Sequence, residues 1–171
     1  MSFNFHFRSL EDRKELSDLI NFLNKQNLGY PEYDSWVQRT ENELDTGYKK
    51  AILAFSEKNL VGNLVYQTHK GDSSFLELKN LRVLKNFRLR DFARFMLKQA
   101  EVENLNYKAI ICDIPFNQPE IIKFMESQGY NLFLKIPLYE KDTPDVVMIK
   151  YLEKRELIIP AANKIIYDKA V

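Results

Sequence analysis

Residue types that carry crosslinks, metals or phosphate loops are scarce in this sequence. Its 171 residues include one cysteine, two histidines and five glycines. The single cysteine, Cys112, cannot form an internal disulfide, which indicates a reducing compartment. The two histidines, His6 and His69, are isolated from other metal-binding residue types, so we expect no metal site. Neither a nucleophile elbow, nor a Gly-Lys-Ser/Thr phosphate loop, nor a paired-cysteine motif occurs.

Long apolar runs and an excess of one charge are also missing. No segment approaches the 18 or so apolar residues of a membrane span, and residues 1–6 do not resemble a signal peptide, so we expect a cytoplasmic protein without membrane contact. The 25 basic and 24 acidic residues leave a net charge of +1, which predicts no nucleic-acid partner. With 45% apolar residues, a chain of this length can bury roughly 70% of its unfolded surface.

The hydrophobic pattern predicts an α/β fold with the order β-α-α-β-β-β-α-β-α-β-β. Ser9 to Asp12 resemble a capping box, and a Pro144-Asp145 turn is expected between the last two strands. Helices are expected over about 10–28, 32–46, 92–104 and 119–128. Strands are expected over 3–7, 51–55, 60–66, 75–83, 108–114, 132–139 and 146–152. The prediction is a mixed, strongly twisted sheet of about seven strands flanked by about four helices.

The last residues differ from the rest of the chain. We expect one domain over 1–152 and a C-terminal arm or linker over 153–171, where a charged run precedes a short helical pattern. Three interpretations stay open. The arm packs on a second subunit of a homodimer, it links to a further segment, or it is a helix packed on its own domain.

Two segments in this order resemble the GNAT superfamily of N-acetyltransferases. Residues 81–97, LRVLKNFRLRDFARFML, resemble the family's central strand, loop and helix, with Arg88 and Ala93 at the first and last motif positions. Residues 118–130, QPEIIKFMESQGY, are similar to the late helix that ends in Gly-Phe or Gly-Tyr. The opening Phe7-Arg8-Ser9-Leu10 is also typical, and residues 30–36 resemble a group of bacterial members. The likeness spans about 150 residues.

The resemblance implies that the protein binds acetyl-CoA or another acyl-CoA. Pyrophosphate binds where backbone N–H groups point outward at a helix N-terminus, and glycines let the backbone approach it. Leu89 and Asp91 stand where the family has glycine; Leu89 resists positive φ, and Asp91 adds a carboxylate that can cap the helix. Lys85, Arg88, Arg90 and Arg94 surround that turn and can offset the charge. The implied cofactor-binding residues are Leu81, Val83, Arg88, Leu89, Arg90, Asp91, Phe92, Ala93 and Gln118. The cofactor is expected to enter where strand 75–83 splays from strand 108–114.

The resemblance also implies two catalytic positions. Met125 occupies the place of the family's tyrosine, which protonates the leaving thiolate, and methionine cannot donate a proton. Glu77 can accept a proton from an acceptor amine, directly or through water, or it is a solvated strand residue paired with Lys79. A backbone N–H near Val83 would polarise the thioester.

Two functions therefore remain in view. The first is an acyl-CoA-dependent N-acyltransferase whose acceptor, a small-molecule or peptide amine, attacks the thioester directly. The second is a degenerate GNAT-fold binding or interaction module, which Leu89, Asp91 and Met125 favour. Asp113 and Asn117 lie near the expected site or cap a helix. Tyr30, Tyr33 and Trp36 either floor an acceptor pocket or belong to the core, while Cys112 is interpreted as a small buried apolar residue.

Overall fold

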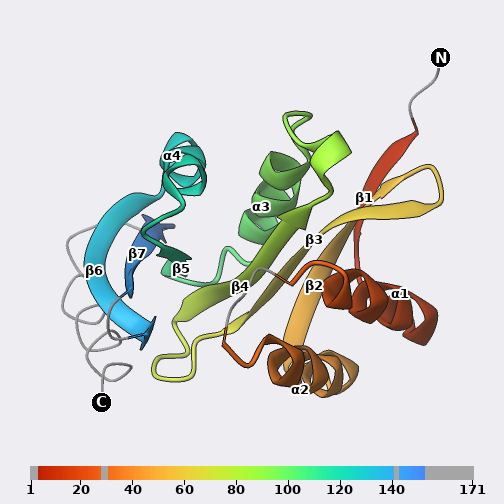
Figure 1. Ribbon diagram of the computed structural model, residues 1–171, viewed down its shortest axis with the longest axis horizontal. Helices are drawn as coiled ribbons and strands as arrows, with labels where there is room; N and C mark the ends of the chain where they lie inside the picture. Colours follow the sequence, from red (N-terminus) through yellow and green to blue (C-terminus); the bar gives the residue numbers. More distant parts are fainter. Residues whose placement is uncertain (1–3, 28–30, 141–142, 153–171) are drawn as a thin grey trace. The chain divides into compact units, whose positions relative to one another are not determined.

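The computed structural model describes residues 4–27, 31–140 and 143–152. They form a seven-stranded mixed sheet in the order β1-β2-β3-β4-β5-β7-β6, with four α-helices (Figure 1). The chain divides into two compact units. The first unit comprises the described residues up to 67 together with 80–103, and the second comprises 68–79 together with the described residues from 104 onward.

The first unit contains the helices α1, α2 and α3 and one side of the sheet. Strands β1 and β2 are antiparallel, as are β2 and β3, and β4 begins in the second unit and ends in the first. Helices α1 and α2 cover one face of these strands and α3 covers the other (Figure 1). The bounds are β1 Phe5–Ser9, α1 Arg13–Asn24, α2 Tyr33–Asp45, β2 Lys49–Ser56, β3 Asn59–Thr68, β4 Phe75–Val83, the 3-10 turn η1 Lys85–Phe87 and α3 Phe92–Glu103.

Helix α1 begins three residues later than the capping-box prediction. Ser9 ends β1, and the N-cap is Asp12, whose carboxylate accepts a hydrogen bond of 2.8 Å from the Glu15 N–H. Glu15 reaches back and accepts from the Glu11 N–H at 3.1 Å. The reciprocal capping expected from the sequence is present, but it uses the later carboxylate pair because the strand extends to Ser9.

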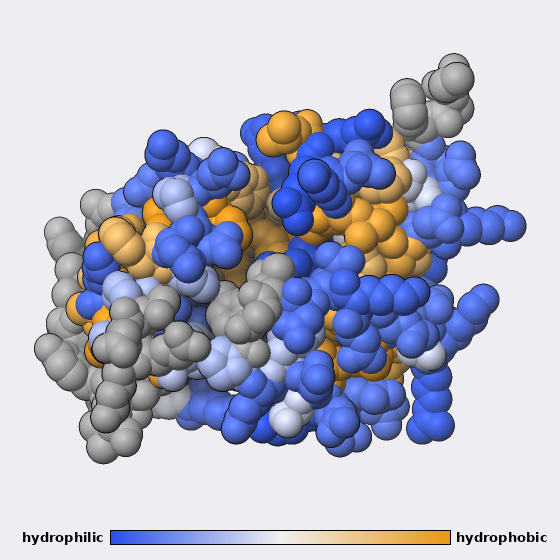
Figure 2. Space-filling view, in the orientation of Figure 1, coloured by the Kyte–Doolittle hydropathy of each residue, from blue (hydrophilic) through white to orange (hydrophobic). Residues whose placement is uncertain are grey.

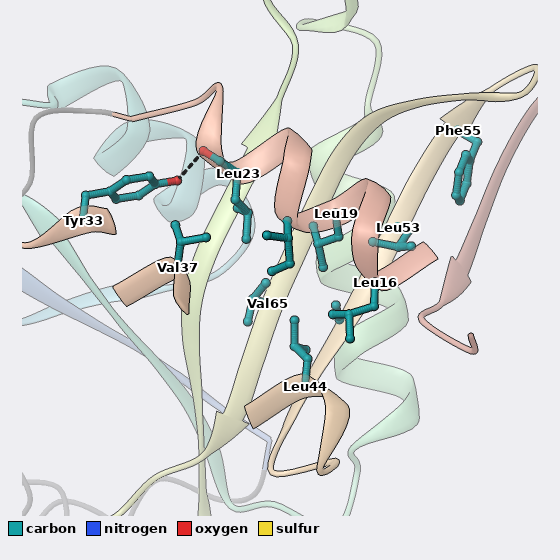
Figure 3. Close-up of a cluster of buried hydrophobic side chains, with 11 residues drawn as sticks. Leu16, Leu19, Leu23, Tyr33, Val37, Leu44, Leu53, Phe55 and Val65 are labelled. Atoms are coloured by element: carbon teal, nitrogen blue, oxygen red, sulfur yellow. Dashed lines mark hydrogen bonds between the residues drawn. The ribbon is translucent and has the colours of Figure 1, made fainter. Parts of the chain in front are cut away.

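Apolar side chains of α1 and α2 pack against β2 and β3 (Figure 3). Leu19 and Leu23 are completely buried, and each such burial stabilises the fold by about 2 kcal/mol. The Tyr33 hydroxyl donates to the Leu23 carbonyl at 2.9 Å (Figure 3). The Tyr33 ring stacks on Trp36 with centroids 5.6 Å apart. Tyr33 and Trp36 are therefore core residues, while Tyr30 lies outside the described residues.

Gly62 allows two strands of the first unit to approach closely. A Cβ at this position would lie 2.8 Å from the Arg82 carbonyl oxygen and 3.3 Å from the Met96 Cε. Because a backbone oxygen cannot move aside as a flexible side chain can, only glycine fits here. The close contact connects β3 to the end of β4 and to α3.

The second unit contains the first part of β4, strands β5 (Ala109–Pro115), β6 (Asn131–Glu140) and β7 (Thr143–Tyr151), and helix α4 (Pro119–Ser127). Phe75, Ala109, Ile111 and Ile149 form its buried cluster. Strands β5 and β7, like β7 and β6, are antiparallel. Pro119 begins α4 as predicted, and Gly129 follows its end with φ +87°.

One turn prediction in this unit is wrong. Pro144 and Asp145 lie within β7, not in a turn before it, and Asp145 pairs with Pro115 and Ile136 on the neighbouring strands. The Asp145 carboxylate accepts a hydrogen bond from the Leu138 N–H at 3.1 Å. That bond satisfies a polar side chain in a strand position, which the turn-forming tendency of Pro-Asp did not predict.

Strands β4 and β5 are parallel but pair over only part of their length. The register joins residues 75–78 to residues 109–112, whereas β4 continues to Val83 and β5 to Pro115. The sequence predicted that these two strands would not stay paired. Residues 153–171, the predicted arm or linker, lie outside the described residues. No helix in the described part of the chain is long and apolar enough to cross a membrane.

Candidate functional site

The turn from the end of β4 into α3 takes the backbone shape of a glycine-containing loop without containing glycine. Leu89 has φ +60° and Asp91 has φ +61°. These are the two positions at which the GNAT resemblance led us to expect glycine. The loop therefore keeps left-handed conformations at both positions, although leucine disfavours positive φ.

This conformation costs free energy that no side-chain contact of Leu89 offsets. An L-residue in the left-handed helical region costs roughly 1–2 kcal/mol, less for Asp than for a branched apolar residue. Leu89 is fully exposed. Figure 2 shows apolar atoms at the tip of the loop between η1 and α3, amid a hydrophilic surface. Residues that are held in a backbone conformation they disfavour cluster at binding and catalytic sites.

Aromatic side chains of the first unit hold the start of α3 in place. Phe92, the first residue of the helix, is buried, and its ring contacts the rings of Phe5, Phe7 and Phe87 with centroid distances of 4.9, 5.5 and 5.9 Å. Phe92 was predicted to bind cofactor, but its side chain belongs to the core. Sequence reasoning missed this aromatic anchor, although the twelve phenylalanines of the chain were a signal.

Backbone N–H groups are available at this helix start. The first hydrogen bond of α3 runs from the Phe95 N–H to the Asp91 carbonyl, at 2.9 Å. The N–H groups of Phe92, Ala93 and Arg94 precede it and have no acceptor within the helix. Ala93 is half-buried and carries only a methyl group, so a bound anion would meet little steric hindrance there.

The Asp91 side chain does not cap the helix as the sequence predicted. Its carboxylate is mostly exposed and lies 3.8 Å from the Arg94 guanidinium, and no hydrogen bond joins it to the described N–H groups of the first turn. Three further cations surround the turn. Lys85 is exposed, Arg88 donates from Nε to the Val83 carbonyl at 3.2 Å, and Arg90 lies over the Phe87 ring at 5.7 Å. The loop thus carries four cations against one carboxylate.

The predicted residues at the end of β4 are half-buried. Leu81 accepts from the Arg82 guanidinium at 3.1 Å through its carbonyl. The N–H of Leu84, which follows Val83, donates to the Val61 carbonyl at 2.9 Å. That N–H is therefore already engaged in the sheet and is not free to polarise a thioester.

The second unit places the other predicted residues on β4 and α4. Met125 is 2% exposed and packs in the interior. Gln118 is the N-cap residue of α4 but makes no side-chain capping hydrogen bond. Neither Asp113 nor Asn117 caps that helix. Of the predicted cofactor residues, eight are brought together in the first unit and Gln118 belongs to the second.

Glu77 is paired with Lys79 but is not solvated. The residue is 2% exposed, and its carboxylate lies 3.1 Å from the Lys79 ammonium group. The alternative interpretation of Glu77 was a solvated residue paired with Lys79. The pairing is confirmed, and the solvation is wrong. A substrate could touch this carboxylate only after its neighbours move, so direct proton transfer to Glu77 is disfavoured by burial.

Sequence reasoning missed Tyr139, a tyrosine of the second unit that interacts electrostatically with Glu77. The Tyr139 hydroxyl donates to Asp113 at 2.6 Å. The pKa of the phenol is raised, first because its hydroxyl is withdrawn from water and then because the Asp113, Glu77 and Asp145 carboxylates disfavour a phenolate. The signal available in the sequence was the position of Tyr139 at the end of a predicted strand.

Cys112 behaves as the sequence predicted. It is buried in β5, and burial raises the pKa of its thiol, with a smaller contribution from the Asp113 charge. It is therefore a neutral core residue. Among the described residues, no three His, Cys, Asp or Glu side chains are grouped so that they could hold a metal ion.

Sequence comparisons identify no relative. No protein-family model matches the chain, and no curated protein matches it. Its structure, however, matches many solved structures.

Three of these structures illustrate the likeness. One is a protein assigned to the GNAT acetyltransferase family from Desulfovibrio desulfuricans, with a TM-score of 0.76, 11% identity, and 88% of this chain and 100% of that chain covered. An aminoglycoside 6'-N-acetyltransferase complexed with coenzyme A matches with a TM-score of 0.70 and 18% identity, with 88% of this chain and 98% of that chain covered. The ribosomal-protein-S18-alanine N-acetyltransferase from Escherichia coli matches with a TM-score of 0.69 and 12% identity, with 90% of this chain and 97% of that chain covered. The chain has the fold of the GNAT superfamily.

Proposed function

We propose that this protein is an acyl-CoA-dependent N-acyltransferase that transfers an acetyl or similar acyl group to an amine. One observation carries the proposal, namely the left-handed backbone at Leu89 and Asp91 in the loop before α3. Glu32 and Glu57 also have positive φ, but each stands alone in its turn, whereas Leu89 and Asp91 lie together at the two loop positions where the resemblance places glycine. Structural relatives whose names state acetyltransferase activity, one of them complexed with coenzyme A, support the same conclusion.

The loop would bind the pyrophosphate of the cofactor through backbone N–H groups. Those of Phe92, Ala93 and Arg94 precede the first helical hydrogen bond, and the positive end of the helix dipole adds to them. The exposed Lys85, Arg88 and Arg90 would add charge-assisted contacts to phosphate oxygens. Asp91 opposes the anion, and its pairing with Arg94 lessens that opposition. The side chain of Phe92 would hold the helix start in place without touching the ligand.

The acceptor would be an amine that attacks the thioester carbonyl directly. Carboxylates in the second unit, on Glu77, Asp113 and Asp145, favour a cationic acceptor. Met125 in α4 and Gln118 at its N-cap have no phenol, so neither position could protonate the thiolate as a tyrosine would. Glu77 would act through its charge, because its carboxylate is buried against Lys79.

Calorimetric titration with acetyl-CoA, followed by detection of free coenzyme A thiol in the presence of a panel of amines, tests the proposal. Ala93→Glu places a carboxylate in the first turn of α3, where it complements the helix dipole but occupies the anion site. We expect this variant to fold and to lose acetyl-CoA binding. Val102→Glu, which adds the same charge at an exposed site near the other end of α3, is the control and should bind normally.

Two results would overturn the proposal. If the wild type binds neither acetyl-CoA nor a longer acyl-CoA, then acyl-CoA is not its cofactor. Binding without thiol release for any amine would indicate a binding module instead of an enzyme.

A further inference from the structure

We propose that the loop before α3 selects the form of coenzyme A that carries a 3'-phosphate, because the exposed cations of this loop, Lys85, Arg88 and Arg90, bind that group. The inference rests on the proposed function and deepens it, since it names the form of the cofactor that the same site prefers over 3'-dephospho-coenzyme A. All three cations belong to the first unit, and so does the helix start that they surround.

The loop carries more positive charge than a pyrophosphate group needs. Pyrophosphate brings one negative charge on each phosphate, and the first N–H groups of α3 and the positive end of the helix dipole suit that charge. Arg94 and Asp91 lie 3.8 Å apart and offset each other in part. In the described part of the chain, no carboxylate forms an ion pair with Lys85, Arg88 or Arg90. Their charge is therefore available to a further anionic group.

The 3-10 turn η1 brings two of these cations to one side of the loop. Lys85 begins the turn, and the Arg88 N–H donates to the Lys85 carbonyl at 3.3 Å. Residues three apart in a 3-10 turn lie on the same side of it. Both residues are exposed. The turn thus offers an ammonium group and a guanidinium group to the same part of the solvent, as binding of one multiply charged anion requires.

Contacts within the loop orient both arginines. The Arg88 Nε donates to the Val83 carbonyl at 3.2 Å, and the terminal nitrogens of this guanidinium have no hydrogen-bond partner among the described residues. The Arg90 guanidinium lies over the Phe87 ring, 5.7 Å from its centroid, which is within the range of a cation–π interaction. A side chain that is already oriented loses less conformational entropy on binding, so these arginines suit an anion better than freely moving surface cations do.

The chemistry of the 3'-phosphate matches these groups. It is a phosphate monoester, so it carries a charge of about −1.5 to −2 at neutral pH and has three oxygens that accept hydrogen bonds. A planar guanidinium can donate two parallel N–H bonds to such a group, and an ammonium group adds a compact charge. The dephospho form has a neutral ribose hydroxyl in that place, which attracts cations far less. The loop cations therefore distinguish the two forms by charge.

Helix α2 of the first unit supplies a matched control. Arg39 is an exposed arginine of this helix, and no described residue forms an ion pair with it. It is the single basic residue of α2, beside four acidic ones, so its surroundings do not attract an anion. Helix α2 covers the face of the strands opposite α3 (Figure 1). Arg39 thus has the same charge and exposure as the loop arginines but lies away from the loop.

The test compares the wild type with Lys85→Gln, Arg90→Gln, the double variant and Arg39→Gln in the full chain. Calorimetric titrations with acetyl-CoA and with 3'-dephospho-acetyl-CoA give the two Kd values, and thermal unfolding checks that each variant folds. We expect the wild type to bind acetyl-CoA about 10-fold more tightly than the dephospho form. Each loop variant should lower this ratio about threefold by weakening acetyl-CoA binding alone, and the double variant should bring it close to unity. Arg39→Gln should keep the wild-type ratio.

Equal Kd values of the wild type for the two thioesters overturn the 3'-phosphate site and leave the proposed function intact. An equal loss for both thioesters in the loop variants also overturns it, because the cations would then serve the pyrophosphate, and so does a ratio that survives in the double variant. If Arg90→Gln fails to fold, Lys85→Gln decides alone, since the Lys85 ammonium group has no ion pair with a described residue to lose. A wild type that binds neither thioester overturns the proposed function together with the 3'-phosphate site.

Discussion

The two units carry their candidate chemistry in different parts of the chain. In the first unit the loop before α3 offers backbone N–H groups, a helix dipole and exposed cations, and its side chains at residues 89 and 91 are not those expected. In the second unit the first part of β4 and the ends of β5 and β6 offer carboxylates and a phenol, so that every contribution there comes from a side chain. A site built from the backbone tolerates replacement of its residues as long as its φ angles survive. A site built from side chains does not.

The largest effect is expected in the second unit, at Glu77. Glu77→Gln keeps the size of the side chain and an oxygen for Lys79 but removes the negative charge. We expect kcat/KM for the amine to fall about 10-fold, because the proposed cationic acceptor would lose the attraction of one negative charge, while the acetyl-CoA Kd stays unchanged. Steady-state kinetics measures this effect. Glu126→Gln, an exposed change in α4, is the control, and an equal loss there would refute the assignment.

In the first unit, a substitution that relieves the strained loop should raise stability. Leu89→Gly removes the cost of a left-handed leucine, and we expect the free energy of unfolding to rise by about 1 kcal/mol. Urea denaturation measures it. Leu89→Ala removes most of the same exposed side chain but retains Cβ, so it should give no such gain. An equal gain in both variants would attribute the effect to the exposed apolar surface.

Asp91 distinguishes charge from backbone shape within the loop. Asp91→Asn removes the carboxylate and keeps a residue that tolerates positive φ, whereas Asp91→Gly also relieves strain. We expect acetyl-CoA to bind about 2–5 times more tightly to Asp91→Asn, in line with the value of one charge at a helix N-terminus. Calorimetry provides the measurement. Weaker binding in both variants would mean that Asp91 does not oppose the phosphate.

The smallest effect concerns a carboxylate of the second unit that has a structural role. Asp72 accepts hydrogen bonds from the Ser74 hydroxyl and N–H at 2.7 and 2.8 Å, which lower the pKa of its carboxyl. A lowered folded-state pKa contributes stability above the unfolded pKa, and that stability is lost as pH falls through the folded value. Ser74→Ala should therefore cost a few tenths of a kcal/mol at neutral pH, because the site is only partly shielded from water.

Ser127→Ala is the control for Ser74→Ala, because it also removes a serine hydroxyl but breaks no hydrogen bond to a carboxylate. Ser127 donates to the Phe124 carbonyl at 2.6 Å, with no carboxylate in that bond. The cost of Ser127→Ala should not vary with pH, while the cost of Ser74→Ala should shrink as pH falls through the lowered pKa of Asp72. Urea unfolding at stepped pH values measures both. A pH-independent cost of Ser74→Ala would show that Asp72 does not titrate through this bond.

The sequence was enough to predict the order of the elements and the bounds of β4, because apolar alternation and the Pro and Gly signals are local. It misplaced the start of α1, where two carboxylate residues compete with Ser9 for the cap, and it put Pro144 and Asp145 in a turn. The loop was interpreted from residue preference alone, which cannot show that the surrounding structure holds Leu89 at positive φ. The Tyr139–Asp113 contact could not be predicted, since it joins strands that are not adjacent.

Gly62 has a consequence for how this protein tolerates mutation. In a saturation library, positions with room for a side chain accept many residues, but a Cβ at residue 62 would lie 2.8 Å from a backbone oxygen of β4. Any replacement would push β3 away from β4 close to the loop that precedes α3. A side chain at residue 89 or 91 points into solvent and displaces nothing, whereas any side chain at residue 62 displaces the backbone of a neighbouring strand.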